Sequence, residues 1–168
     1  MSLTPPPKHE HLSYRRANWP LLKAQLDKIG KDSKPQWGEL TPPRLFRHLH
    51  YTIQVSLSEV PVPDKSTWFT RGIGRKLFFE WFTNWPKAKI KAPPNYTPTD
   101  VQELELERAR LYAGVERFID ELEKNPRRQT VSELLGTLPL DYWAHVHGLH
   151  TNHHLKQYGL GRKLPLPS

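Results

Sequence analysis

Five of the nine histidines in this chain stand in one short segment near the C-terminus. The segment, residues 145–159, reads HVHGLHTNHHLKQYG. His150 and His154 are four residues apart, so on a helix they lie one above the other on the same face. Two imidazoles in that arrangement can bind one metal ion. The spacing therefore indicates a candidate metal site.

The angular positions of the other polar residues on this helix distinguish those that can reach the site from those that cannot. His147 lies within one turn of His150 on the same face and is the alternative ligand. His153 is rotated by about 100° from His154, which places it at the rim of the site, and His145 is expected to point away. Gln157, one turn beyond His154, either orients a ligand from behind or is an exposed glutamine at the helix end.

A third candidate ligand, His48, belongs to a different helical segment. It stands at the edge of an apolar stripe, three residues after Leu45, whereas His50 is about 200° further round and is expected to face solvent. The interiors of helical bundles hold metal sites built from facing helices. Burying several imidazoles without partners costs free energy, which a metal would avoid. The predicted ligands are therefore His48, His150 and His154.

The donor atoms limit the chemistry of such a site. The chain has no cysteine, so a transition metal must be bound by His, Asp or Glu. Three histidines leave at least one coordination position open, as in catalytic sites, where a bound water would be acidified or displaced by substrate. No HExxH segment is present, so the glutamate base of that motif is missing and the catalytic residues stay unknown.

The elements that position these histidines are predicted to be helices joined by loops. Thr41 and Thr137 are the expected N-caps of the two helices that carry the ligands, and Thr99 with Gln102 forms a capping-box pattern for another. No alternating strand pattern occurs, and residues 127–136 are expected to be a connection, either irregular or with a short helical turn. The sequence thus predicts an all-α four-helix bundle. The expected helices cover residues 14–29, 42–59, 99–124 and about 138–158.

The length of 168 residues suggests a single domain, expected over residues 14–160. Residues 1–13 are polar and proline-rich and are expected to form a flexible tail in which His9 and His11 are solvated. Residues 161–168 are expected to form a second tail. No apolar run suits a signal peptide or a membrane span, so a cytoplasmic location is expected.

A basic, aromatic segment over residues 68–91 is expected to add helix between the second and third helices. The chain carries a net charge of +8, and residues 71–91 contain six Lys and Arg against one Glu. Phe78, Trp81, Phe82 and Trp85 follow the spacing of a helix that packs on a core, which we favour. Two other uses of the segment are binding to single-stranded nucleic acid and binding to an anionic membrane.

The C-terminal residues resemble the closing motif of a known family. Trp143 followed by HTNHHLKQYG, residues 150–159, is similar to the last helix of the DinB/YfiT-like superfamily. The similarity is greater to a branch of small uncharacterised bacterial proteins whose last helix reads W-x6-H-x2-HHL-x-Q-[FY]-G. Residues 135–139, Trp37-Gly38 and the segment 45–49 also fit that branch. The resemblance covers about residues 14–160.

The resemblance implies a four-helix bundle with a divalent ion, often nickel or zinc, held by one histidine of the second helix and two of the last. By position these are His48, His150 and His154. Members of the superfamily include metal-dependent transferases that use small thiols, and hydrolase-like proteins. The implied function is a metal-dependent transferase or hydrolase acting on a small-molecule substrate. The alternative is a non-catalytic bundle that forms a homodimer, or that binds nucleic acid or an acidic partner.

Overall fold

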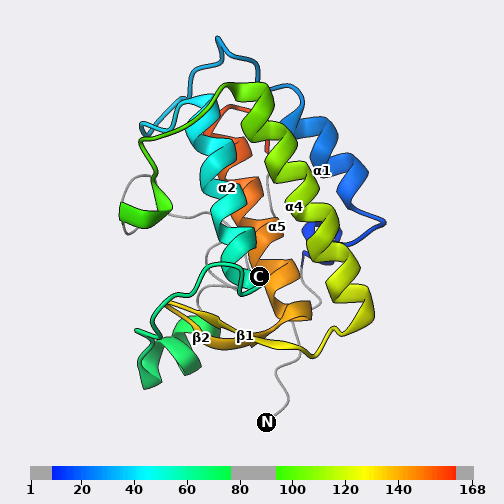
Figure 1. Cartoon of the computed structure of the whole chain (residues 1–168), viewed down its shortest axis with the longest axis vertical. Coiled ribbons are helices and arrows are strands. Elements are labelled where there is room, and N and C mark those ends of the chain that lie inside the picture. Colours follow the sequence, from blue (N-terminus) through cyan, green and yellow to red (C-terminus); the bar gives the residue numbers. More distant parts are fainter. Residues whose placement is uncertain (1–8, 77–93, 162–168) are drawn as a thin grey trace, which may run out of the picture.

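The computed structural model describes residues 9–76 and 94–161 of the chain. This part is mostly helical, with one small antiparallel sheet at the end of the helices (Figure 1). The mainly helical class is therefore confirmed, but the expectation of an all-α chain is wrong. The principal elements are α1 (Trp19–Leu26), α2 (Pro42–Ser56), α4 (Leu104–Lys124), β1 (Gln129–Ser132), β2 (Gly136–Pro139) and α5 (Leu140–Gln157).

Helix α5 lies at the centre of the molecule, behind α2 and α4 in Figure 1. All its residues except His153 and Lys156 are buried. The N-terminal segment crosses its backbone, and the amide of Tyr14 donates to the carbonyl of Ala144 at 2.9 Å. Gly148 allows this approach, because a Cβ atom there would lie 2.0 Å from the carbonyl oxygen of Leu12.

The packing of the N-terminal segment corrects one expectation. His9, expected to be solvated, is buried, whereas His11 is exposed as predicted. A 3-10 turn over Glu10–Leu12 follows His9 and leads the chain onto α5. Leu12 and Tyr14 are part of the hydrophobic core. The sequence did not predict the burial of His9, because a polar and proline-rich composition does not show that a short segment lies along a buried helix.

Helices α2 and α4 pack side by side, and α1 lies against α4 (Figure 1). The rings of Trp19 and Tyr112 are 5.5 Å apart, and Arg108 donates to the carbonyl of Ile29 at 2.7 Å. Helix α1 is shorter than the predicted 14–29, although its expected apolar face is buried. Thr41 occupies the N-cap position of α2 as predicted, but its side chain makes no capping hydrogen bond.

Helix α4 begins later than the sequence predicted. Its N-cap is Glu103, so the capping box of Thr99 with Gln102 is wrong. Instead, the carboxylate of Glu107 accepts a hydrogen bond from the backbone amide of Gln102 at 3.0 Å. This bond satisfies an amide that stands just before the first turn of the helix. The helix ends at Lys124 before Asn125, as expected.

A β-hairpin stands before α5, where a connection, irregular or with a short helical turn, was expected. Thr137 belongs to β2, where it pairs with Val131 of β1, and it does not cap the helix. Helix α5 starts after Pro139, which is its N-cap. The turn of the hairpin packs on the segment after α2, where the amide of Lys65 donates to the carbonyl of Glu133 at 2.9 Å. The hairpin therefore covers the end of α2 and leads directly into the histidine-bearing helix.

Within residues 9–76 and 94–161, no helix has both the length and the apolar character needed to cross a bilayer. The predicted core packing of Phe78, Trp81, Phe82 and Trp85 falls outside these ranges. Trp68, at the start of the aromatic segment, is 82% exposed. A π-helical turn over Thr70–Gly74 follows it.

Candidate metal centre

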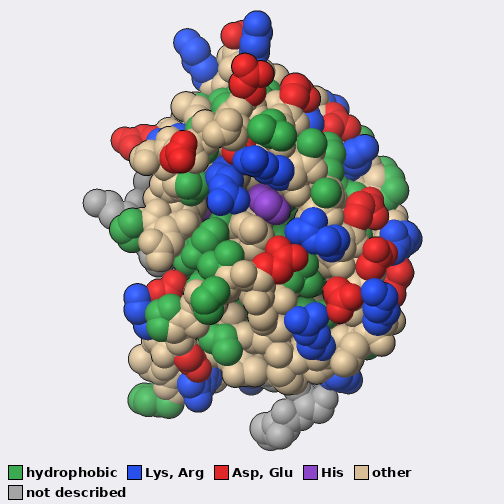
Figure 2. Space-filling model, viewed as in Figure 1, with side chains coloured by type: hydrophobic (Ala, Val, Ile, Leu, Met, Phe, Trp, Pro, Cys, Tyr) green, Lys and Arg blue, Asp and Glu red, His purple; other side chains and the backbone are tan. Residues whose placement is uncertain are grey.

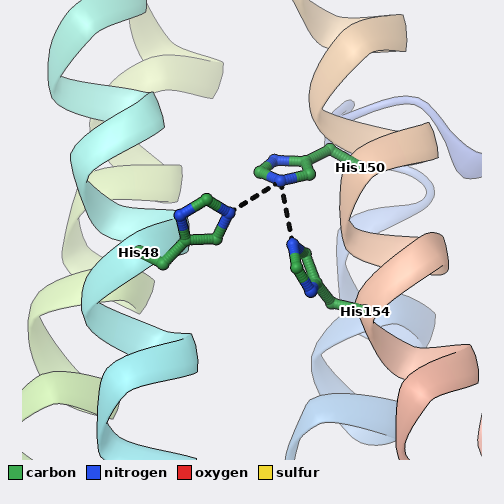
Figure 3. Close-up of side chains that lie close together, drawn as sticks. All are labelled: His48, His150 and His154. Atoms are coloured by element: carbon green, nitrogen blue, oxygen red, sulfur yellow. Dashed lines mark hydrogen bonds between the residues drawn. The ribbon is translucent and has the colours of Figure 1, made fainter. Parts of the chain in front are cut away.

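Three histidines face one another between α2 and α5. Figure 3 shows His48 of α2 directed at His150 and His154 of α5. The Nε2 atom of His150 lies 2.9 Å from Nε2 of His48 and 3.0 Å from Nε2 of His154. All three side chains are buried, and one ligand atom from each lies within 4.8 Å of the others. The structure thus brings together the three residues that the sequence selected, and the cluster could hold a metal ion.

Hydrogen bonds set the tautomers of two of these rings. Nδ1–H of His48 donates to the backbone carbonyl of Tyr96, and Nδ1–H of His154 donates to Oε1 of Gln157 at 2.6 Å. A neutral imidazole carries a single N–H, so Nε2 of His48 and Nε2 of His154 each present a lone pair. This arrangement is the one that orients metal-binding histidines in proteins.

Burial keeps the three rings in their neutral form. It lowers the pKa of His48, and it lowers the pKa of His150 and of His154 well below the usual value, with neighbouring imidazoles adding to the effect. Neutral imidazole is the form that binds metal. A single N–H on Nε2 of His150 can point at only one of its two neighbours. A cation placed among the three lone pairs would satisfy all of them.

Two of the three donor spacings are close to those around a first-row divalent ion. Ligands about 2.0–2.1 Å from a tetrahedral ion lie about 3.3 Å from one another. The two Nε2–Nε2 distances of 2.9 and 3.0 Å differ from that value by a few tenths of an ångström. Imidazole suits zinc, nickel, copper and iron. Three such ligands on two helices leave a coordination position that none of them fills.

His147, the alternative ligand, has a different partner. The hydroxyl of Ser56 donates to the carbonyl of Ile53, so its oxygen accepts the Nε2–H of His147 at 2.9 Å. The ring stacks on Trp143 with centroids 5.3 Å apart. Burial lowers its pKa to about 3. His147 therefore links α5 to α2 below the cluster.

The positions of three other histidines can be compared with the helix faces that the sequence predicted for them. His153 is half-buried at the rim, as predicted, with its ring 6.5 Å from that of Trp37. His145 was expected to point away, but it is buried and its Nε2 lies 2.9 Å from a carboxylate oxygen of Glu10. His50, expected to face solvent, is also buried, because it lies against Gly114 of α4. Both expectations were wrong.

Gln157 lies behind the cluster in a closely packed position. It is buried, so the alternative of an exposed glutamine at the helix end is wrong. The backbone carbonyl of Gln157 accepts a hydrogen bond from the backbone amide of Gln36 at 2.6 Å. A Cβ on Gly38 would lie 3.0 Å from the side-chain Nε2 of Gln157. The positive φ of 77° at Gly38 also favours glycine. The loop before α2 therefore fixes the side chain that orients His154.

Tyr96 is a contributor that the sequence did not single out. It ends a 3-10 turn over Pro94–Tyr96, and its ring lies 4.9 Å from that of Tyr51 on α2. Its contact with His48 is made by a backbone carbonyl, and every residue has one. No side-chain signal could have identified it.

The fold and the cluster define a mainly helical protein with a buried group of three histidines that could bind a metal. Over residues 10–159 the chain matches the family described as "Protein of unknown function (DUF1569)", and it belongs to that family. A search of curated proteins and a search of solved structures found no match. The matched range includes all three histidines of the cluster.

Proposed function

We propose that the chain is a metal-dependent enzyme of the DinB-like type, a transferase or hydrolase acting on a small substrate. Zinc or nickel is the proposed ion, and His48, His150 and His154 are its proposed ligands. The observation that carries this proposal is the convergence of three neutral, buried imidazoles on one point, with two tautomers set by partners behind them. The similarity of residues 143–159 to the DinB/YfiT-like closing motif supports it.

The chain's own residues hold and orient the ligands in the proposed site. When bound, a divalent ion supplies Lewis-acid chemistry, polarising a carbonyl or acidifying a coordinated water or thiol. Tyr96 and Gln157 hold the rings of His48 and His154 so that their lone pairs point inward. The burial of the three rings between α2 and α5 keeps bulk water away from them, and electrostatic interactions of an ion held there would be stronger for that reason.

Metal content tests the proposed ligands directly. Purified wild type is expected to retain about one zinc or nickel ion per chain after dialysis. His150→Ala removes the ligand between the other two and is expected to lose the ion. His153→Ala is the matched control, since it changes the neighbouring histidine at the rim and is expected to keep it. Equal metal content in wild type and His150→Ala would contradict the proposal.

Activity tests the enzymatic part of the proposal. The metal-loaded protein is assayed for thiol addition to small electrophiles and for hydrolysis of small esters and amides. Any activity found is expected to disappear after metal removal and in His150→Ala, and to persist in His153→Ala. Activity that survives in His150→Ala would show that the chemistry lies elsewhere.

A further inference from the structure

Large apolar side chains gather on one exposed corner of the molecule. Among the described residues, six large hydrophobic side chains are exposed, and four of them belong to this corner. They are Trp68 at 82%, Phe69 at 44%, Ile73 at 52% and Leu134 at 53% exposure. The other two, Leu21 and Leu106, belong to α1 and α4. We call the four residues the apolar corner.

The apolar corner is built from two segments held together. The first three residues come from the helical stretch after α2, and Leu134 comes from the turn between β1 and β2. Arg75 donates to the carbonyl of Leu135 at 2.9 Å, and a Cβ on Gly136 would lie 2.8 Å from the hydroxyl of Ser66. These contacts, together with that of Lys65 and Glu133, join the hairpin turn to the stretch on both sides of Trp68.

Basic residues surround the apolar corner. The side chains of Lys65 and Arg71 are 64% and 54% exposed, and they pair with Glu133 at 2.7 Å and with Asp64 at 2.8 Å. Lys76 is exposed as well, and the two segments 64–76 and 133–136 together hold four Lys and Arg against two acidic residues, so the corner keeps a net positive charge. Figure 2 shows hydrophobic side chains together with basic and acidic ones at the lower left, the region where Figure 1 places the hairpin. The chain as a whole carries a net charge of +8. A surface that combines exposed aromatic and aliphatic groups with cations matches the chemistry of an anionic bilayer surface.

We propose that the apolar corner docks on an anionic lipid bilayer. Tryptophan and phenylalanine enter the headgroup boundary, while lysine and arginine attract anionic headgroups. Nucleic acid is the less favoured occupant, because Ile73 and Leu134 offer no flat ring on which a base can stack. A second copy of the chain is less favoured too, since it would bring two basic corners together.

Vesicle binding tests this proposal on the full chain. Sedimentation is compared for vesicles of phosphatidylcholine alone and of phosphatidylcholine mixed with phosphatidylglycerol. We expect binding to the anionic vesicles, at least about tenfold weaker binding to the neutral ones, and weaker binding as salt rises. A blue shift of tryptophan emission on binding is also expected from the wild type. Absence of binding to anionic vesicles would overturn the proposal.

Variants of exposed residues test which surface binds. The double variant Trp68→Ser with Ile73→Ser is expected to weaken binding to anionic vesicles by about tenfold or more. Leu21→Ser with Leu106→Ser is the matched control, because it removes two exposed apolar side chains elsewhere and should bind like wild type. Lys76→Glu is expected to weaken binding, and Lys31→Glu, in an exposed loop, to weaken it less. Equal binding by the two double variants would contradict the proposal.

Two further measurements separate the other occupants. If the solution mass of wild type is that of a dimer and only Trp68→Ser with Ile73→Ser makes it monomeric, the apolar corner is a self-interface and the bilayer proposal fails. If the corner binds a single-stranded oligonucleotide but not anionic vesicles, nucleic acid is the partner and the proposal fails. Metal content is expected to be unchanged in all of these variants, because none contacts the three histidines.

Discussion

At the scale of single residues, Gln157 gives the most direct test of how the histidine cluster is oriented. Its Oε1 accepts from Nδ1 of His154, and its own position is set by the loop before α2. We expect Gln157→Leu to lower zinc affinity by about 10- to 100-fold, the usual effect of losing such a partner. Competition for zinc with a chromophoric chelator measures the affinity of each variant.

The control for that variant is Gln54→Leu, which removes a glutamine of α2 that accepts from Arg47 instead. This variant is expected to bind zinc as tightly as wild type. Unchanged affinity in Gln157→Leu would mean that the amide does not orient the cluster.

The sequence predicted the three clustered histidines because helical phase reports which residues share a face. It was wrong for His50 and His145 because phase does not report what covers the other faces. His50 is buried by Gly114 of α4, and His145 by the N-terminal segment with Glu10. The contact of His145 with Glu10 was not predicted because residues 1–13 were expected to form a flexible tail. Residues far apart in sequence decide such cases.

At the scale of elements, Gly148 controls how closely the N-terminal segment approaches α5. In Gly148→Ala, the new Cβ would lie 2.0 Å from the carbonyl oxygen of Leu12, which is backbone and cannot rotate away. Alanine favours helix by about 1 kcal/mol over glycine, but overpacking costs about 1–3 kcal/mol in typical cores and more against backbone. We therefore expect a net loss of unfolding free energy, measured by urea denaturation.

Gly30→Ala is the comparison for that substitution. A Cβ at this position meets nothing within 4 Å. The unfolding free energy of Gly30→Ala is expected to stay close to that of wild type. If Gly148→Ala is as stable as wild type, the segment 12–14 does not lie on α5 as described.

The burial of His147 between α5 and α2 makes stability depend on pH. Burial lowers the pKa of His147 from 6.5 to about 3. Between these values the unfolded chain binds a proton that the folded chain excludes, so unfolding free energy falls as pH falls. This contribution reaches about 1.4 kcal/mol per pH unit and vanishes above about pH 6.5.

Urea denaturation of metal-free protein between pH 7 and pH 5 measures this dependence. His147→Gln keeps a donor for Ser56 but cannot titrate in this range, so its stability should fall less steeply with pH than that of wild type. Parallel slopes would show that His147 does not contribute. The metal must be absent, because it also binds deprotonated histidine.

Among the elements, the sequence predicted α2 and the end of α4 well, because long apolar periodicity specifies them. It missed the hairpin because β1 and β2 have four residues each and contain threonine, serine, glycine and proline. Such short strands show no alternation that a pattern can detect. Their pairing depends on contacts with residues 65–75, which lie far away in the sequence.

At the scale of the whole molecule, a central helix rich in polar residues is the main feature. A helix buried on all sides is normally apolar. Here α5 carries many buried polar groups, and three of them contact polar groups from different parts of the fold. Tyr14 pairs with Thr151 at 2.5 Å, Ser56 with His147, and Glu10 with His145. The three clustered Nε2 atoms instead face one another, as expected for groups arranged around a cation.

The position of a bound ion tests this central claim most directly. Crystals of the protein loaded with zinc, measured above and below the zinc absorption edge, locate the metal by its anomalous scattering. We predict one strong peak between α2 and α5, about 2.0–2.1 Å from Nε2 of His48, His150 and His154. A peak at another site, or none in fully loaded protein, would contradict the account.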